Sequence, residues 1–175
     1  TKAEKIAYLK ALGAVVYICP ANVAADDPRS YYEVAKRIAA ETPDSLYINQ
    51  YFNELNIDAH YQSTGPEIWE QTEGKITHLI ACTGTGGTLS GSAKFLKEKN
   101  PNIKIIGVDA SGSILKGFHE NGVINKDDIH PYQIEGMGKN LIPAALLFDK
   151  IDEFVRVNDE MAAYRTREIA LKEAI

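Results

Sequence analysis

A run of glycines and threonines between two regular segments is the feature that most constrains this fold. Residues 76–81 are mostly apolar, residues 83–88 read Thr-Gly-Thr-Gly-Gly-Thr, and residues 89–98 have a helical pattern. A buried strand that ends in glycines and then starts a helix places backbone N–H groups where an anion can bind. A second apolar run, residues 103–109, follows within the length of a βαβ unit, so the two strands are expected to pair in parallel.

The rest of the chain alternates between strand-like and helix-like segments. Three more short apolar runs are predicted to be strands, at residues 14–19, 45–51 and 151–157. Helices are expected over residues 6–12 before Gly13, after the capping residue Ser30, and after the capping residue Asn158. Residues 57–71 are helical too, and Gly65-Pro66 within them predicts a kink or two abutting helices. The sequence therefore predicts an α/β fold with a parallel sheet flanked by helices.

Charge and cysteine content exclude several classes of partner. The formal net charge is -5 and basic residues are interspersed with acidic ones, so no nucleic-acid partner is expected. No apolar run approaches membrane-spanning length, and the first residues show no signal-peptide pattern. The two cysteines, Cys19 and Cys82, and the four histidines lack metal-ligand spacing, which favours a reduced cytoplasmic protein without a metal site. Cys82, at the end of an expected strand, is predicted to be buried and inert.

The glycine run fits neither of the two common nucleotide motifs. The dinucleotide fingerprint requires a small third residue, but Leu89 stands at that position. The P-loop requires a lysine after its second spaced glycine, but Ser92 follows Gly91. These departures argue against NAD and ATP as ligands.

What remains is a compact cup that suits one phosphate monoester. Its backbone N–H groups converge at the three glycines, and two threonines add hydroxyl donors next to the positive end of the following helix. No basic side chain lies in the run, so the sequence predicts binding through backbone and hydroxyl groups. The alternative is that the glycines only form a tight turn between strand and helix. The residues of the cup are Gly84, Thr85, Gly86, Gly87 and Thr88.

The motifs on both sides of the cup resemble, in order and approximate spacing, those of one known group of enzymes. They cover nearly the whole chain: residues 49–53, 64–69, 83–88, 106–109, 135–138 and 142–143. This series resembles the fold-type II pyridoxal-phosphate enzymes, within them the family of cystathionine β-synthase and cysteine synthase. The resemblance implies a tryptophan synthase β-like α/β fold that is incomplete at both ends. Residues 1–44 would belong to the smaller N-terminal lobe, and residues 45–175 to the larger lobe that binds the cofactor phosphate.

The resemblance also implies roles for individual residues. Pyridoxal 5'-phosphate would be the cofactor, with its phosphate in the cup and the backbone of Gly136 beside it. Gln50 would contact the substrate carboxylate, and Tyr132, Glu135 and Asp109 would shape the side that receives the amino acid or thiol. Without the family, Gln50 reads as a strand-end amide, Tyr132 as a packing residue and Asp109 as the solvated end of a strand. The family's cofactor-linked lysine has no counterpart here and is expected upstream, so no catalytic residue is assigned.

The implied reaction is β-replacement on serine or O-acetylserine by a thiol. Synthesis of cystathionine from serine and homocysteine is favoured over synthesis of cysteine, because Val108-Asp109 followed by Gly112-Ser113 resembles the cystathionine-forming branch. The run at residues 64–69 occurs in both branches, so cysteine synthase stays an alternative. Serine or threonine dehydratase is a third possibility, against which residues 50–69 argue.

A noncatalytic reading is also open. The absent lysine favours an α/β module that binds a phosphate-bearing metabolite and acts as a regulator. If the enzyme reading holds, the chain is a central fragment of a homodimeric protein whose partners are small amino-acid and thiol substrates. The isolated polypeptide is then expected to show no turnover and to expose apolar surface.

Overall fold

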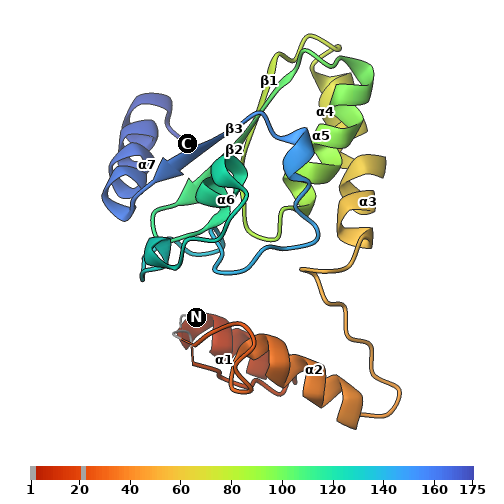
Figure 1. The fold of residues 1–175 in the computed structure, drawn as a ribbon, viewed down its shortest axis with the longest axis vertical. Helices are drawn as coiled ribbons and strands as arrows, with labels where there is room; N and C mark the ends of the chain where they lie inside the picture. Colours follow the sequence, from red (N-terminus) through yellow and green to blue (C-terminus); the bar gives the residue numbers. More distant parts are fainter. Residues whose placement is uncertain (1–2, 21–22) are drawn as a thin grey trace. The chain divides into compact units, whose positions relative to one another are not determined.

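The chain divides into two compact units, Thr1–Tyr47 and Ile48–Ile175, in a computed structural model that describes residues 3–20 and 23–175 (Figure 1). The first unit contains helix α1 (Ala3–Ala11) and helix α2 (Tyr31–Glu41). The predicted cap of α2 is confirmed, since the Ser30 hydroxyl accepts a hydrogen bond of 3.2 Å from the Glu33 N–H. The predicted end of α1 is also confirmed, because Gly13 follows it with a left-handed φ of 85°. That the units correspond to two lobes of an enzyme stays a prediction.

The second unit is built on a three-stranded parallel sheet. Its strands are β1 (His78–Cys82), β2 (Lys104–Ala110) and β3 (Glu153–Val157), in the order β1-β2-β3. Ile80 lies opposite Ile106, and Val108 lies opposite Val155. The helices of the unit are α3 (Leu55–Gln62), α4 (Thr64–Gln71), α5 (Gly87–Lys99), α6 (Leu115–Asn121) and α7 (Asp159–Glu173), with short 3-10 turns η1 (Lys126–Asp128) and η2 (Phe148–Lys150). The predicted α/β class and the parallel pairing are confirmed.

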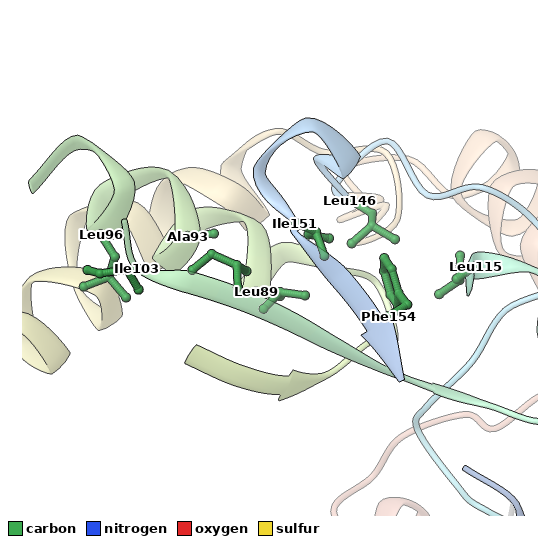
Figure 2. Close-up of a cluster of buried hydrophobic side chains, with 9 residues drawn as sticks. Leu89, Ala93, Leu96, Ile103, Leu115, Leu146, Ile151 and Phe154 are labelled. Carbon is green, nitrogen blue, oxygen red and sulfur yellow. The ribbon is translucent and has the colours of Figure 1, made fainter. Parts of the chain in front are cut away.

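The hydrophobic core lies between the sheet and helix α5. Leu89 and Leu96 of α5 are 1% and 0% exposed, and Phe154 of β3 is 2% exposed (Figure 2). Strand β2 contributes Ile105, and α6 contributes Leu115, both fully buried. Because α5 starts directly at the glycine run, this packing fixes where the first turn of the helix stands.

The opposite face of the sheet is apolar, and no described residue of this unit covers it. Side chains along a strand alternate between faces, and the residues next to the buried positions include Ile80, which is 62% exposed, and Val155, which is 41% exposed. Ile106 and Val108 lie between them on β2 and are only half-buried. The exposed apolar surface expected from the sequence is therefore present on this unit.

Two of the predicted strands are wrong. Residues 14–19 and 45–51 have no strand structure, and Val15, Ile18 and Leu46 are 79%, 76% and 84% exposed. A strand needs a neighbouring chain to pair with its backbone N–H and C=O groups. Within residues 3–20 and 23–175 the sheet contains only β1, β2 and β3, so these apolar runs find no partner.

The helices are short, and their ends follow local sequence signals. The region predicted as kinked consists of two abutting helices, α3 and α4, which are separated at Ser63. Pro66 lies in the first turn of α4, where its missing N–H has no helical partner to lose. Asn158 caps α7 as predicted, by accepting a hydrogen bond of 2.8 Å from the Met161 N–H. None of the helices in the described part of the chain is long and apolar enough to span a membrane.

Candidate active site

Thr83 ties the glycine run to two other segments. Its N–H and its hydroxyl both donate to the Val108 carbonyl, at 3.0 and 2.8 Å, and its own carbonyl accepts from the Gly138 N–H at 2.8 Å. The residue is fully buried. The end of β1 is thereby joined to β2 and to residues 136–138, so the cup has a rigid base.

Two glycines of the run are required by close packing. A Cβ on Gly84 would stand 2.5 Å from the Gly136 carbonyl oxygen. Gly86 has a φ of 92°, and a Cβ there would also stand 2.6 Å from the Leu146 Cβ. No side chain caps the following helix α5 at Gly86, so the N–H groups of its first turn are available to a ligand. This geometry supports the cup that the spacing predicts.

A cleft with a volume of about 380 Å³ opens at this cup. It brings together six of the residues predicted to form the site, and adds four that the sequence did not indicate. The predicted residues are Gln50, Gly84, Thr85, Gly86, Thr88 and Gly136. The additional ones are Tyr51, Cys82, Leu89 and Lys139.

The two threonine hydroxyls of the cleft are held by neighbours on α3. The Asn56 amide donates to the Thr85 hydroxyl at 3.1 Å and to the Gln50 carbonyl at 2.8 Å. The Thr88 hydroxyl lies 3.1 Å from His60 Nε2. When Asn56 and a His60 Nε2–H donate to these oxygens, each hydroxyl keeps its own proton for an anion in the cleft.

Gly87 was predicted to contact the cofactor, but it is not among the residues that line the cleft. The position that a Cβ would occupy is filled by the side chain of Asn56. Gly87 is buried and forms the first residue of α5. The missing side chain of Gly87 lets α3 pack close to α5, and this packing brings Asn56 to Thr85.

Tyr132 and Glu135 do not line the cleft. The Tyr132 hydroxyl donates to the Met137 carbonyl at 2.9 Å, and it would stand 2.6 Å from a Cβ on Gly138. Burial raises the pKa of Tyr132, so the hydroxyl stays protonated and keeps donating. Glu135 is exposed. The structure places Tyr132 as a brace for the turn that carries Gly136, which agrees with the simpler packing interpretation.

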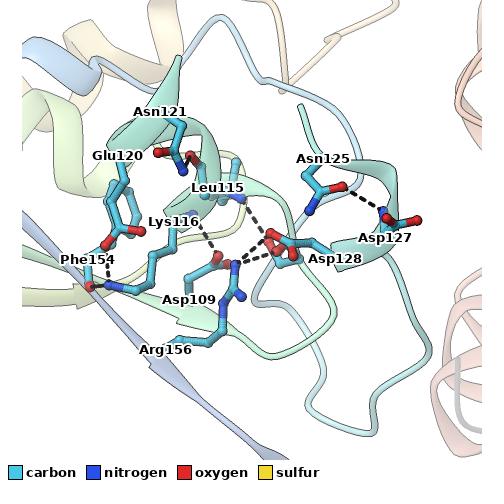
Figure 3. Close-up of polar contacts among 12 residues, drawn as sticks. Asp109, Leu115, Lys116, Glu120, Asn121, Asn125, Asp127, Asp128, Phe154 and Arg156 are labelled. Atoms are coloured by element: carbon cyan, nitrogen blue, oxygen red, sulfur yellow. Dashed lines mark hydrogen bonds and ion pairs between the residues drawn. The ribbon is translucent and has the colours of Figure 1, made fainter. Parts of the chain in front are cut away.

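Asp109 lies away from the cleft as well, in a polar network at the end of β2 (Figure 3). It is fully buried, and its carboxylate accepts hydrogen bonds of 2.9 Å from the Ala110 and Lys116 N–H groups. Burial raises its pKa, against the opposing effects of these hydrogen bonds and of the Arg156 charge. The expectation of a solvated strand end is wrong, and the cleft gives no support for a contact between Asp109 and substrate.

We expect Asp109→Asn to lower the free energy of unfolding by about 1–3 kcal/mol, because an amide offers one acceptor oxygen to two buried N–H donors. The raised pKa means that ionisation of Asp109 costs stability as pH rises from the ordinary aspartate range through the raised value. The stability lead of the native protein over the variant should therefore shrink as pH rises through that window. Urea denaturation of both proteins across acidic pH measures this difference in the free energy of unfolding. A difference that grows as pH rises would contradict this account.

The sequence also misplaced Cys82 and missed Lys139. Cys82 is exposed and lines the cleft, because the face of β1 on which it stands is uncovered; the prediction of a buried thiol is wrong. Lys139 directly follows residues 136–138, and it lines the cleft. The local sequence pointed to Lys139 in one way only: the residue directly follows the motif at residues 135–138, which was assigned to the site.

A glycine-rich turn between a parallel strand and a helix, opening on a cleft lined by hydroxyls, defines an α/β phosphate-binding protein. The chain belongs to the pyridoxal-phosphate dependent enzyme family, whose profile matches residues 1–175. Members of this family depend on pyridoxal phosphate, and the cleft suits the phosphate of that cofactor. The predicted family and cofactor are thus confirmed.

Curated relatives agree with this assignment. The chain is 39% identical over 172 residues to a cystathionine beta-synthase of Apis mellifera, covering 98% of this chain and 33% of that protein. It is 43% identical over 157 residues to the cystathionine beta-synthase of Mus musculus, covering 90% of this chain and 28% of that protein. It is 34% identical over 172 residues to an O-acetylserine dependent cystathionine beta-synthase of Bacillus subtilis, covering 98% of this chain and 52% of that protein. The chain thus spans between about a quarter and a half of the length of these relatives.

Proposed function

We propose that this chain forms the central, phosphate-binding part of a pyridoxal-phosphate enzyme that joins serine and homocysteine to give cystathionine. The observation that supports this most is the match of 98% of the chain to a cystathionine beta-synthase, with the cleft at the matched glycine run. When bound, the cofactor supplies an electron sink for charge that develops on the amino acid. The protein's share is to bind, orient and exclude water.

The residues of the cleft fit such a cofactor. The backbone N–H groups of Gly84 and Gly86 and the hydroxyls of Thr85 and Thr88 would hold the phosphate, and a Cβ at either glycine would collide with a neighbouring segment. The backbone of Gly136 would lie along the cofactor. Gln50 would bind the carboxylate of the amino acid. Leu89, buried under the cup, would keep water from its floor.

The decisive experiment uses the protein encoded by the complete reading frame. We expect visible absorption from a cofactor bound to a lysine upstream of residue 1, and release of cystathionine from serine and homocysteine, measured by mass spectrometry. Absence of any such lysine from the complete sequence would refute the enzyme. In that case the second candidate, a noncatalytic module for a phosphate metabolite, predicts calorimetric binding of simple phosphate esters as tight as that of pyridoxal phosphate.

The donor and the acceptor are separate questions. The name of the Bacillus subtilis relative makes O-acetylserine a candidate donor here too. Parallel assays pair serine or O-acetylserine with homocysteine or sulfide, and the product of each pairing identifies the donor and the acceptor. Cysteine formed from O-acetylserine and sulfide, without cystathionine, would indicate the cysteine synthase alternative. We propose a cytoplasmic homodimer as the setting, which sedimentation of the complete protein would check.

The hydroxyl of Thr88 provides a test of the phosphate assignment. We expect Thr88→Val to weaken pyridoxal-phosphate binding about tenfold, since a hydrogen bond to a charged group contributes about 1.5–3 kcal/mol. Thr88→Ser keeps the hydroxyl and should bind within about twofold of the native protein. Fluorescence titration of the cofactor-free protein measures both. Equal affinities of the Val variant and the native protein would remove Thr88 from the site.

A further inference from the structure

Lys139 supplies a positive charge to the cleft. It is the one charged side chain among the described residues that line it. Its ammonium lies 4.9 Å from the centre of the Tyr51 ring and donates to the Tyr51 hydroxyl at 3.3 Å. The side chain is half-buried, and within residues 3–20 and 23–175 it makes no ion pair with a carboxylate. A half-buried cation without an anionic partner favours an anion that enters the cleft.

The backbone of Lys139 is held on both sides. Its N–H donates to the buried Ser113 hydroxyl at 2.9 Å, and its carbonyl accepts from the Ile114 N–H at 2.9 Å. The preceding Gly138 is bonded to Thr83 at the base of the cup. The ammonium therefore stands on a fixed support, and the Tyr51 ring limits where it can point.

The contacts of the ammonium lie on the side of the cleft formed by Gln50 and Tyr51. The Nζ contacts the hydroxyl and the ring of Tyr51, which directly follows Gln50, the residue assigned to the substrate carboxylate. The cup already offers the first turn of α5 and two threonine hydroxyls to the phosphate. Lys139 is therefore placed to meet a second anion on the Gln50–Tyr51 side of the cleft.

We propose that Lys139 binds the carboxylate of an amino-acid substrate and so selects carboxylate-bearing substrates. This inference rests on the proposed function for the identity of the ligand. Both the donor and the thiol acceptor carry an α-carboxylate, and the arms of the experiment below distinguish them. Tyr51 acts as a positioning residue, because it orients the ammonium.

The test compares three variants of the complete protein. Lys139→Met removes the charge at similar length, and Lys139→Arg keeps it. Lys94→Met is the matched control, because Lys94 is also half-buried and stands 4.7 Å from the centre of a tyrosine ring, that of Tyr61, yet does not line the cleft. Affinity for pyridoxal phosphate is measured first, by fluorescence titration of the cofactor-free protein. It should stay within about twofold in all three variants.

The donor arm measures binding of L-serine and of L-serinamide, in which an amide replaces the carboxylate. Ligand-observed NMR on the cofactor-free protein gives one readout, and the cofactor absorption of the loaded protein gives another. The acceptor arm compares the KM of homocysteine with that of 2-mercaptoethanol, a thiol without a carboxylate. Lys139→Met should weaken binding of the carboxylate-bearing ligand of one arm about tenfold and should not weaken binding of its counterpart without a carboxylate. Lys139→Arg should stay within about threefold of the native protein.

Several results would overturn the inference. One is an equal loss of affinity for ligands with and without a carboxylate, and another is a loss of affinity for pyridoxal phosphate alone. The others are an Arg variant that binds as weakly as the Met variant, or unchanged affinity and KM in both arms. A failure of the proposed function looks different, because the native protein itself would then form no cystathionine from serine and homocysteine. The NMR arm, which needs no cofactor, still reports whether Lys139 discriminates serine from serinamide.

Discussion

Replacing Gly84 by Ala is expected to weaken binding of pyridoxal phosphate about tenfold to a hundredfold. The added Cβ would stand 2.5 Å from the Gly136 carbonyl oxygen, which is well inside van der Waals contact. The strand end is bonded to both β2 and Gly138 through Thr83, so it cannot move aside without cost. Overpacking of this kind costs about 1–3 kcal/mol, which corresponds to the expected loss of affinity.

The experiment titrates the cofactor-free complete protein with pyridoxal phosphate and follows unfolding in urea. Gly122→Ala is the control, because Gly122 has a left-handed φ of 70° but nothing within 4 Å of the added Cβ. That variant should lose about 1 kcal/mol of stability and no affinity for the cofactor. If Gly84→Ala binds as tightly as the native protein, the close approach of the cup to Gly136 does not define the site.

The elements that sequence could predict are those defined by neighbouring residues. The cup needs a strand, a turn and a helix start that follow one another directly, and all three are encoded between residues 76 and 98. The caps at Ser30 and Asn158 are equally local, since each side chain binds an N–H three residues later. Such signals do not depend on how the rest of the chain folds.

The wrongly predicted strands show what a local apolar pattern cannot predict. Residues 14–19 are as apolar as β1, but a strand is defined by a partner that sequence pattern does not identify. β1 has that partner because α5 returns the chain to β2 alongside it. The same limit explains Cys82, whose exposure depends on what covers one face of the sheet.

Only part of the candidate site could be predicted from the sequence. Gln50 and Gly136 were assigned through a family resemblance, and the fold brings both to the cleft beside the cup. Lys139 was missed because its charge reaches the cleft through the turn at Gly138, and no spacing rule connects it to Tyr51. Asp109 was assigned to the substrate side through the same resemblance, yet its carboxylate accepts hydrogen bonds from backbone N–H groups. Which way a side chain turns is decided by packing.

Phe154 connects the sheet to the rest of the core. A Cβ on Gly107, the neighbouring residue of β2, would stand 2.5 Å from the Phe154 ring. The ring also lies 5.2 Å from that of His119 and 6.0 Å from that of Phe148, measured between centroids. β3 pairs with the part of β2 that leads to Ser113, which supports Lys139. Phe154 also belongs to the same core cluster as Leu89, which lines the cleft.

Phe154→Ala is expected to lower the free energy of unfolding by about 3–5 kcal/mol, because it leaves a cavity that the surrounding rings and Gly107 cannot fill. The free energy of unfolding of a typical domain is about 5–15 kcal/mol, so this loss is a large part of it. Val155→Ala is the matched control: it is the next residue of the same strand, 41% exposed on the uncovered face, and should cost less than about 1 kcal/mol. Urea denaturation of the complete protein compares the two. Equal costs would mean that the face of the sheet covered by α5 does not form the core of this unit.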